Sequence, residues 1–118
     1  MTVLWVFLGG GLGALARYGL ILALPRAATG FPWATLAANL LGSFLIGLLF
    51  VTLAERDGAR FFLIVGLLGG FTTFSTLSFE VVTLIQARET AQALAYMGVT
   101  LGASLAACWL GLRLGGHA

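Results

Sequence analysis

The sequence predicts an all-α membrane protein with four transmembrane helices, and three observations support this fold class. The 118 residues are 60% hydrophobic and only 8% charged, which is too apolar for a soluble domain of this size. The apolar residues form four stretches, at about 3–24, 33–53, 61–85 and 91–112, and each is long enough to cross a hydrocarbon core. Little sequence remains between the stretches, so we expect residues 1–118 to form a single four-helix transmembrane domain.

The arginines predict how the chain assembles. All six basic residues are Arg, and four spans place both termini and the 55–60 loop on one side of the membrane. The side with the termini then carries Arg56, Arg60 and Arg113. The other side carries Arg26 and Arg88, and also Arg17 if its side chain reaches that surface. The positive-inside rule needs an asymmetry, and this distribution gives almost none. A chain without bias inserts both ways up, so we expect a dual-topology antiparallel homodimer, the two-chain equivalent of an inverted repeat.

The first stretch combines a glycine pattern with one charged residue. Gly9 and Gly13 lie four residues apart, a spacing that lets membrane helices pack closely, and packing is the interpretation we favour. Arg17 lies about 10 Å of helix rise from Pro25, where the stretch ends. Its side chain either snorkels to that surface or faces a polar vestibule that attracts anions. The start lacks positive charge and the apolar run is too long, so we expect no cleavable signal peptide.

The second stretch places an amide inside the apolar run. Asn39 is not at the edge of the run, so its side chain must find a partner in the protein interior or in water. Ser43 follows one turn later on the same face, and Gly42 allows a neighbour to approach. The Asn39 amide either forms hydrogen bonds that hold two helices together or acts as a neutral donor for a dehydrated anion.

The centre of the third stretch is unusual for a membrane helix. Its sequence is Gly69-Gly70-Phe71-Thr72-Thr73-Phe74-Ser75-Thr76. Glycine costs about 1 kcal/mol in a helix interior, and Ser and Thr compete for backbone hydrogen bonds. We therefore expect helix three to be broken at mid-membrane, where freed carbonyls can form an ion site, although the same residues also suit a packing face. At a break, Gly69→Val would force the backbone out of its conformation.

A line of hydroxyls follows one face of the fourth stretch. Tyr96, Thr100 and Ser104 are spaced i, i+4 and i+8, which gives one hydroxyl per helical turn. Such a line can pass an ion from one hydroxyl to the next. Helix packing is the alternative, because this stretch is also rich in small residues: Gly98, Gly102 and Ala106.

Several function classes find no support in the sequence. Cys108 is the only cysteine and His117 the only histidine, so a zinc or haem site lacks ligands. The few basic residues form no nucleic-acid footprint, and no nucleotide-binding motif is present. We see no nucleophile–base pair, so we do not expect an enzyme.

The central run, with its Gly-Gly-x-Thr-Thr-Phe-Ser-Thr pattern from Gly69 to Thr76, resembles the signature of the Fluc/CrcB fluoride channel family. Gly10 to Tyr18 looks like the first-helix pattern of that family. The second-helix pattern is matched by Thr35, Asn39, Gly42 and Ser43. The resemblance covers essentially the whole chain, and the length and four-span layout agree with it.

The resemblance implies a dual-topology homodimer in the bacterial inner membrane, with two pores for passive fluoride export. It implies a sodium ion at the dimer centre, bound by the backbone carbonyls of Gly69 and Thr72. Arg17 and Glu80 would line vestibules. The implied fluoride pore consists of Asn39, Phe74, Ser75, Thr76, Tyr96, Thr100 and Ser104. Asn39 would contact fluoride, and Phe74 would turn the positive edge of its ring toward the anion.

Two observations keep other interpretations open. The family usually has a second Phe three residues after the first, whereas this chain has Leu77, so a two-ring box is incomplete. Glu80 is the only acidic residue within a span, and it is either functional at depth or close enough to 86–89 to sit in an aqueous vestibule. A membrane carboxylate is also what a small dual-topology multidrug exporter uses to bind cations. That exporter is the alternative function.

Overall fold

A computed structural model describes residues 1–25 and 30–116 of the chain, so the predicted topology charge at Arg26 lies outside the described residues. The first two helices are α1 (Thr2–Ala23) and α2 (Trp33–Thr52). The third apolar stretch forms α3 (Asp57–Ala59), the π-helix η1 (Arg60–Leu68), α4 (Gly69–Phe71) and α5 (Ser75–Gln86). The fourth forms α6 (Thr90–Gly116).

Within the described ranges, four helical segments are long and apolar enough to cross a membrane: Thr2–Ala23, Trp33–Thr52, Asp57–Gln86 and Thr90–Gly116. The predicted all-α fold with four spans is therefore confirmed, and the chain is a multi-pass membrane protein. The structure extends the third and fourth spans beyond their expected limits, because charged and polar residues at their ends still continue the helix.

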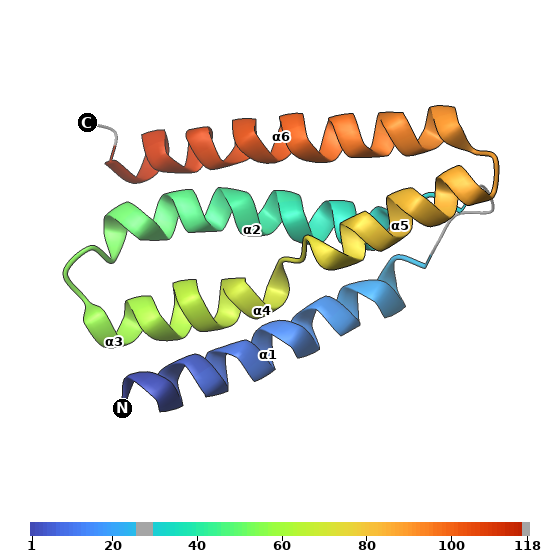
Figure 1. Ribbon diagram of the computed structural model, residues 1–118. Coiled ribbons are helices and arrows are strands. Elements are labelled where there is room, and N and C mark those ends of the chain that lie inside the picture. The colour runs from blue at the N-terminus through green and yellow to red at the C-terminus, as the bar shows by residue number, and fades with distance from the viewer. Residues whose placement is uncertain (26–29, 117–118) are drawn as a thin grey trace.

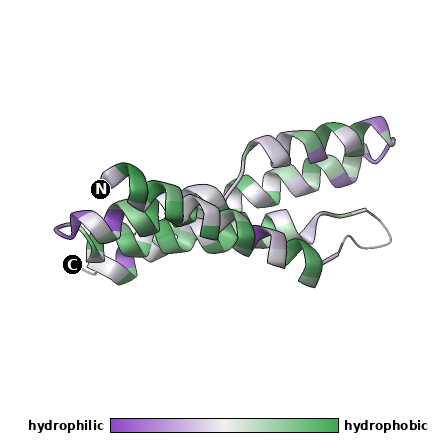
Figure 2. Ribbon diagram, turned by 90° about the horizontal axis from the view of Figure 1, so that it is seen from below, coloured by the Kyte–Doolittle hydropathy of each residue, from purple (hydrophilic) through white to green (hydrophobic). Residues whose placement is uncertain are grey.

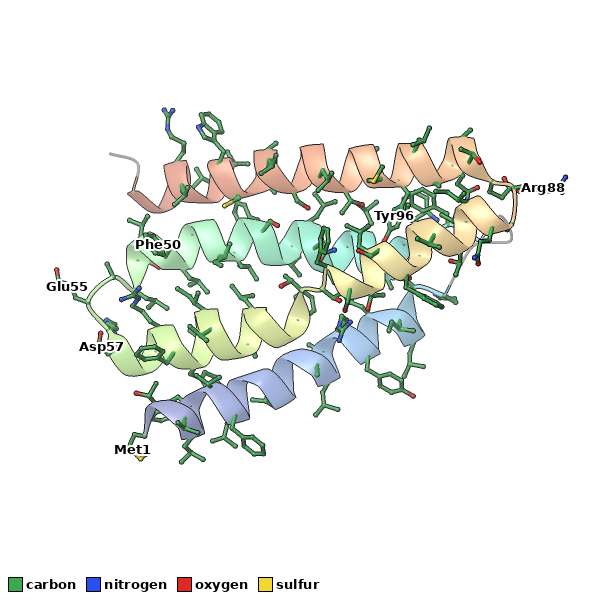
Figure 3. The ribbon with its side chains drawn as sticks, viewed as in Figure 1. Met1, Phe50, Glu55, Asp57, Arg88 and Tyr96 are labelled. Atoms are coloured by element: carbon green, nitrogen blue, oxygen red, sulfur yellow. The ribbon has the colours of Figure 1, made fainter. Side chains whose placement is uncertain are left out.

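The helices lie side by side in an elongated bundle (Figure 1). The start of α1, the end of α6 and the turn between α2 and α3 lie at one end, and the turn between α5 and α6 lies at the other. Figure 3 shows Met1, Glu55 and Asp57 at the first end and Arg88 at the second. Strongly hydrophilic colour gathers mainly at these two ends, as a chain that crosses a membrane requires (Figure 2).

Glycines hold α1 against the third span. A Cβ added at Gly9 would meet backbone atoms of Phe62, Gly66 and Leu67, and one added at Gly13 would meet backbone atoms of Leu67 and Phe71. The packing role expected for Gly9 and Gly13 is confirmed, because any side chain there would push the two backbones apart.

Packing in the fourth span uses other glycines than expected. A Cβ at Gly98 or Gly102 would meet nothing within 4 Å. The contact between α2 and α6 is instead made at Gly47 and Gly111, where a Cβ would meet backbone of the opposite helix. The small residues around the hydroxyl line are thus free of packing contacts within the described chain.

The helical path of the third span is interrupted between α4 and α5. Thr72 has an extended backbone, with φ −87° and ψ 158°, and α5 resumes at Ser75. Gly69 has ordinary helical angles, φ −62° and ψ −39°, and a Cβ there would meet only the Ile64 oxygen at 3.9 Å. Within the single chain a Val at Gly69 would therefore be compatible with the backbone, and an effect of Gly69→Val on the assembled protein stays a prediction.

The glycine contacts predict that the same substitution will affect stability very differently at two positions on α1. Gly13→Val should lower the free energy of unfolding by about 2 kcal/mol or more, because the side chain overpacks against backbone that cannot rotate away. Gly11→Val is the matched control, since a Cβ at Gly11 meets nothing within 4 Å. Thermal unfolding in detergent measures both variants. Equal midpoints for the two would contradict close packing of α1 at Gly13.

Candidate functional site

Asn39 on α2 holds the interruption in the third span. Its side-chain Nδ2 donates to the Thr73 carbonyl at 3.1 Å, and its Oδ1 accepts from the Thr73 amide at 2.9 Å. A single side-chain amide thus satisfies both backbone groups of one residue that has left the helix. Asn39 is 9% exposed and both bonds are partly buried, so they cost more to break than bonds on an open surface.

These bonds redirect the amides that an unbroken helix would use. In an α-helix, the Thr73 amide would pair with the Gly69 carbonyl, and the Thr76 amide with the Thr72 carbonyl. The Thr73 amide instead donates to Asn39, and the Thr76 amide donates to Thr73 Oγ1 at 3.2 Å. Both carbonyls expected to bind sodium thereby have their usual amide donors engaged elsewhere.

Gly69 and Thr72 line a small cavity of about 200 Å³ together with Gly42 and Ser43. We call it the break cavity. The Thr72 hydroxyl donates to the Leu68 carbonyl at 2.9 Å, so this hydroxyl is already engaged within its own segment. Among the described residues, no three His, Cys, Asp or Glu side chains gather around a metal. Uncharged carbonyl oxygens without carboxylates suit a monovalent hard cation, so the residues present fit the implied sodium.

A second and larger cavity, of about 380 Å³, lies between α2, the interruption and α6. We call it the central cavity. Thr100 is 2% exposed, and its Oγ1 is buried without a hydrogen-bond partner, as is Ser104 Oγ. Residues that line this cavity include Asn39, Ser43, Thr73, Phe74, Leu77, Thr100, Ser104 and Cys108. Two of the three hydroxyls predicted on α6 thus face the same space as Asn39.

Aromatic and hydroxyl residues of the interruption take different positions. Phe74 is 72% exposed and lines the central cavity, so one face of its ring is open. Ser75 is exposed and lines none of the cavities described here, with its Oγ 3.5 Å from Thr73 Oγ1. Thr76 turns away from the central cavity and accepts a hydrogen bond from Arg17 at 3.2 Å.

Arg17, Thr35, Thr76 and Glu80 line a third cavity of about 300 Å³, together with Pro25 and Pro32. We call it the entry cavity, because these prolines flank the end of α1 and the start of α2. The Arg17 Nε is buried without a hydrogen-bond partner. Both residues that the family resemblance assigns to a vestibule therefore line one space.

The structure places Tyr96 apart from the other hydroxyls of α6. Its OH donates to Glu80 Oε1 at 2.8 Å, and Thr35 Oγ1 donates to Glu80 Oε2 at 3.1 Å. Tyr96 is fully buried and packs edge-on against Phe31 at 5.3 Å between ring centroids. Tyr96 therefore lines neither the central cavity nor the entry cavity, and it is connected to the entry cavity only through its bond to Glu80.

Several polar residues of the cavities were not nominated as site residues from the sequence, including Thr35, Ser43 and Cys108. Thr35 lies one turn before Asn39, and Ser43 one turn after it, so helical spacing alone could have joined them. Cys108 continues the i+4 spacing of Thr100 and Ser104. Cys108 was missed because the sequence interpretation considered only hydroxyl and amide side chains as candidates for this line.

Comparison with known proteins identifies the relatives of this arrangement. The family model described as "CrcB-like protein, Camphor Resistance (CrcB)" matches residues 4–112. The chain belongs to the CrcB family. Similar members include a "Fluoride-specific ion channel FluC" of Thermus thermophilus, 52% identical over 96% of this chain and 94% of the relative. Another of that name, from Paracoccus denitrificans, is 45% identical over 97% of this chain and 94% of the relative. The predicted resemblance is confirmed.

Leu77 stands where the CrcB family pattern leads us to expect a second Phe. It is 4% exposed and packs in a core cluster with Leu36, Val81 and Tyr96. Leu77 also lines the central cavity, so Phe74 is the one aromatic side chain of the interruption that does so.

The two bonds between Asn39 and Thr73 predict the outcome of Asn39→Asp. The aspartate cannot donate to the Thr73 carbonyl, and its second oxygen faces that carbonyl at hydrogen-bond distance. We expect the free energy of unfolding to fall by about 1–3 kcal/mol, the cost of leaving a buried polar group unpaired. Thermal unfolding in detergent measures the loss, with Ser43→Ala as the control one turn away. An unchanged midpoint for Asn39→Asp would mean that this amide does not support the interruption.

Proposed function

We propose that this chain is a fluoride-selective channel that lets fluoride leave the bacterial cytoplasm passively. The observation that carries the proposal is the pair of buried, unpartnered hydroxyls, Thr100 Oγ1 and Ser104 Oγ, at the central cavity. Each unpaired buried hydroxyl costs about 1–3 kcal/mol, so such groups are kept where a ligand completes them. The relatives named as fluoride-specific channels supply the identity of that ligand.

The chemistry of the central cavity suits a small dehydrated anion. Hydroxyl groups can donate short hydrogen bonds that replace water, and they carry no fixed positive charge that would trap the ion. Phe74 adds the positive edge of an aromatic ring, which favours an anion without holding it tightly. Arg17 at the entry cavity concentrates anions near the start of the path.

We propose that helix three is broken at mid-membrane and that two chains assemble as an antiparallel homodimer. The central cavity combines buried polar groups with exposed apolar side chains such as Phe74 and Leu105, which are 72% exposed each. Lipid cannot satisfy the polar groups of such a surface, whereas a second copy can cover it. Among the described arginines, Arg56, Arg60 and Arg113 oppose Arg17 and Arg88, a balance that supports insertion in both orientations.

A sodium ion at the dimer centre completes the proposal. Two inverted copies would bring four carbonyls, from Gly69 and Thr72 of each chain, to one axis. Their partial negative charges in a low dielectric need a counter-charge, which a bound monovalent cation supplies. The residues of the chain hold the ion through backbone oxygens, so it is structural and does not move with fluoride.

A multidrug-type cation exporter is the alternative function, but the surroundings of Glu80 favour it less than they favour a fluoride channel. Such an exporter needs a membrane carboxylate that is available to a cation. Both oxygens of Glu80 already accept hydrogen bonds, from Thr35 and Tyr96, and Arg17 lines the same cavity. A cationic neighbour disfavours binding of a second cation there.

The proposal predicts that Thr100→Val reduces fluoride flux about tenfold, because losing one charge-assisted hydrogen bond of about 1.4 kcal/mol is a factor of ten. Thr52→Val is the matched control, since Thr52 is exposed near the end of α2 and lines none of the cavities described here. Fluoride efflux from liposomes, with chloride as the comparison ion, measures both. Equal fluoride flux in the two variants, or equal passage of chloride and fluoride in wild type, would contradict the proposal.

Dual topology predicts that one loop is accessible from both sides of a single membrane. Ala54→Cys in a Cys108→Ser background places a neutral, exposed label in the turn between α2 and α3. An impermeant thiol reagent should reach about half of these sites from outside intact cells, because unbiased insertion divides the chains equally. Labelling close to all or to none would leave a single orientation and overturn the antiparallel homodimer.

A further inference from the structure

The lone thiol of the chain lies on the line of polar groups along α6. Cys108 follows Ser104 by four residues and Thr100 by eight, so all three side chains share one helix face. All three line the central cavity. Cys108 is the member nearest the end of α6 that carries Arg113.

A packing role does not account for the position of this side chain. A Cβ added at Gly47 would meet the Cys108 backbone oxygen, so α6 contacts α2 through its backbone at this level. The Cys108 side chain is partly exposed and faces the cavity. A purely structural cysteine in a membrane helix would instead be enclosed by apolar neighbours.

The same cavity holds an independent sign of a ligand. Thr100 is 2% exposed and its Oγ1 has no hydrogen-bond partner, although it lines the space into which Cys108 also projects. A buried hydroxyl without a partner marks a space that a polar species enters, and not a dry packed interior.

We propose that Cys108 is a pore-lining modification site, at which a thiol-specific electrophile arriving through water closes the ion path. The proposal rests on the fluoride channel function above. A thiol at this position continues the line of donors while it is free, and any group attached to its sulfur projects into the central cavity. The modified chain then loses the continuous narrow path that a strongly hydrated anion needs.

The chemistry is that of thiol–disulfide exchange with a methanethiosulfonate. The Cys108 thiol gives its proton to water, and the thiolate sulfur attacks the sulfenyl sulfur of the reagent. A new disulfide bond forms, the sulfur–sulfur bond of the reagent breaks, and methanesulfinate leaves with the electron pair. An added dithiol reverses the reaction by the same exchange and restores the free thiol.

The experiment treats purified full-length protein in detergent with trimethylammonium-ethyl methanethiosulfonate. In detergent the reagent can reach the protein from both ends of the bundle. The protein is then reconstituted, and each sample is compared with its own untreated flux. We expect modified wild type to lose fluoride flux at least about tenfold, because a bulky group in a narrow path removes the donors beyond it. Dithiothreitol before reconstitution should restore the flux.

Two variants separate pore closure from general damage. Cys108→Ser contains no thiol, so the reagent should leave its own flux unaltered. Ala106→Cys in the Cys108→Ser background places a thiol on the opposite face of α6, on an exposed residue outside the central cavity. Mass spectrometry confirms that this thiol is labelled, and its flux should persist after labelling.

Each outcome decides the proposal. Complete labelling of Cys108 with flux retained would overturn it, as would loss of flux in treated Cys108→Ser. Failure of the native protein to label, when the same protein denatured in detergent labels fully, would show that the electrophile does not reach the thiol and would also overturn the proposal. Untreated wild type without fluoride flux would overturn the channel function itself, whatever the labelling shows.

Discussion

The double hydrogen bond between Asn39 and Thr73 is the interaction on which the rest of the site depends. An interruption inside an apolar span leaves backbone groups that lipid cannot satisfy. The Thr73 hydroxyl accepts from the Thr76 amide, but the backbone amide and carbonyl of Thr73 itself need partners from elsewhere. One carboxamide from the neighbouring helix satisfies the amide and the carbonyl of Thr73 together. This arrangement sets the direction of α5, and through it the positions of Phe74, Thr76 and Glu80.

The two halves of the third span are therefore held in the bundle by different kinds of interaction. Its first half is held to α1 by backbone contacts at glycines, which are short-range and depend on shape alone. Its second half adds polar bonds to an apolar cluster that includes Leu77 and Val81: Arg17 bonds to Thr76, and Thr35 and Tyr96 bond to Glu80. Hydrogen bonds in a low dielectric are directional and strong, so they fix side chains where a cavity must keep its form.

Composition and apolar length were enough to predict four helices, because the bilayer requires about 20 apolar residues for each helical crossing. Helical spacing also placed Thr100 and Ser104 on one face. It could not separate Tyr96 from them, since that separation depends on where a carboxylate on another helix lies. Likewise the angles of Gly69 could not be known from its type, because glycine is compatible with a normal helix as well as with a distorted one. The π-helical path of η1 gives no periodic signal distinct from an α-helix over nine residues.

The short turn between α5 and α6 has a consequence for the order in which the bundle forms. Only Ala87, Arg88 and Glu89 separate the two helices, and Arg88 adopts a left-handed backbone, φ 66°, that reverses the chain. The bond from Tyr96 to Glu80 therefore spans 16 residues, whereas that from Arg17 to Thr76 spans 59. Closing a shorter loop costs less entropy, so we expect this helical hairpin to form before α1 docks. On this order of events, we expect Glu80 to be bonded to Tyr96 of its own hairpin before α1 packs against the third span.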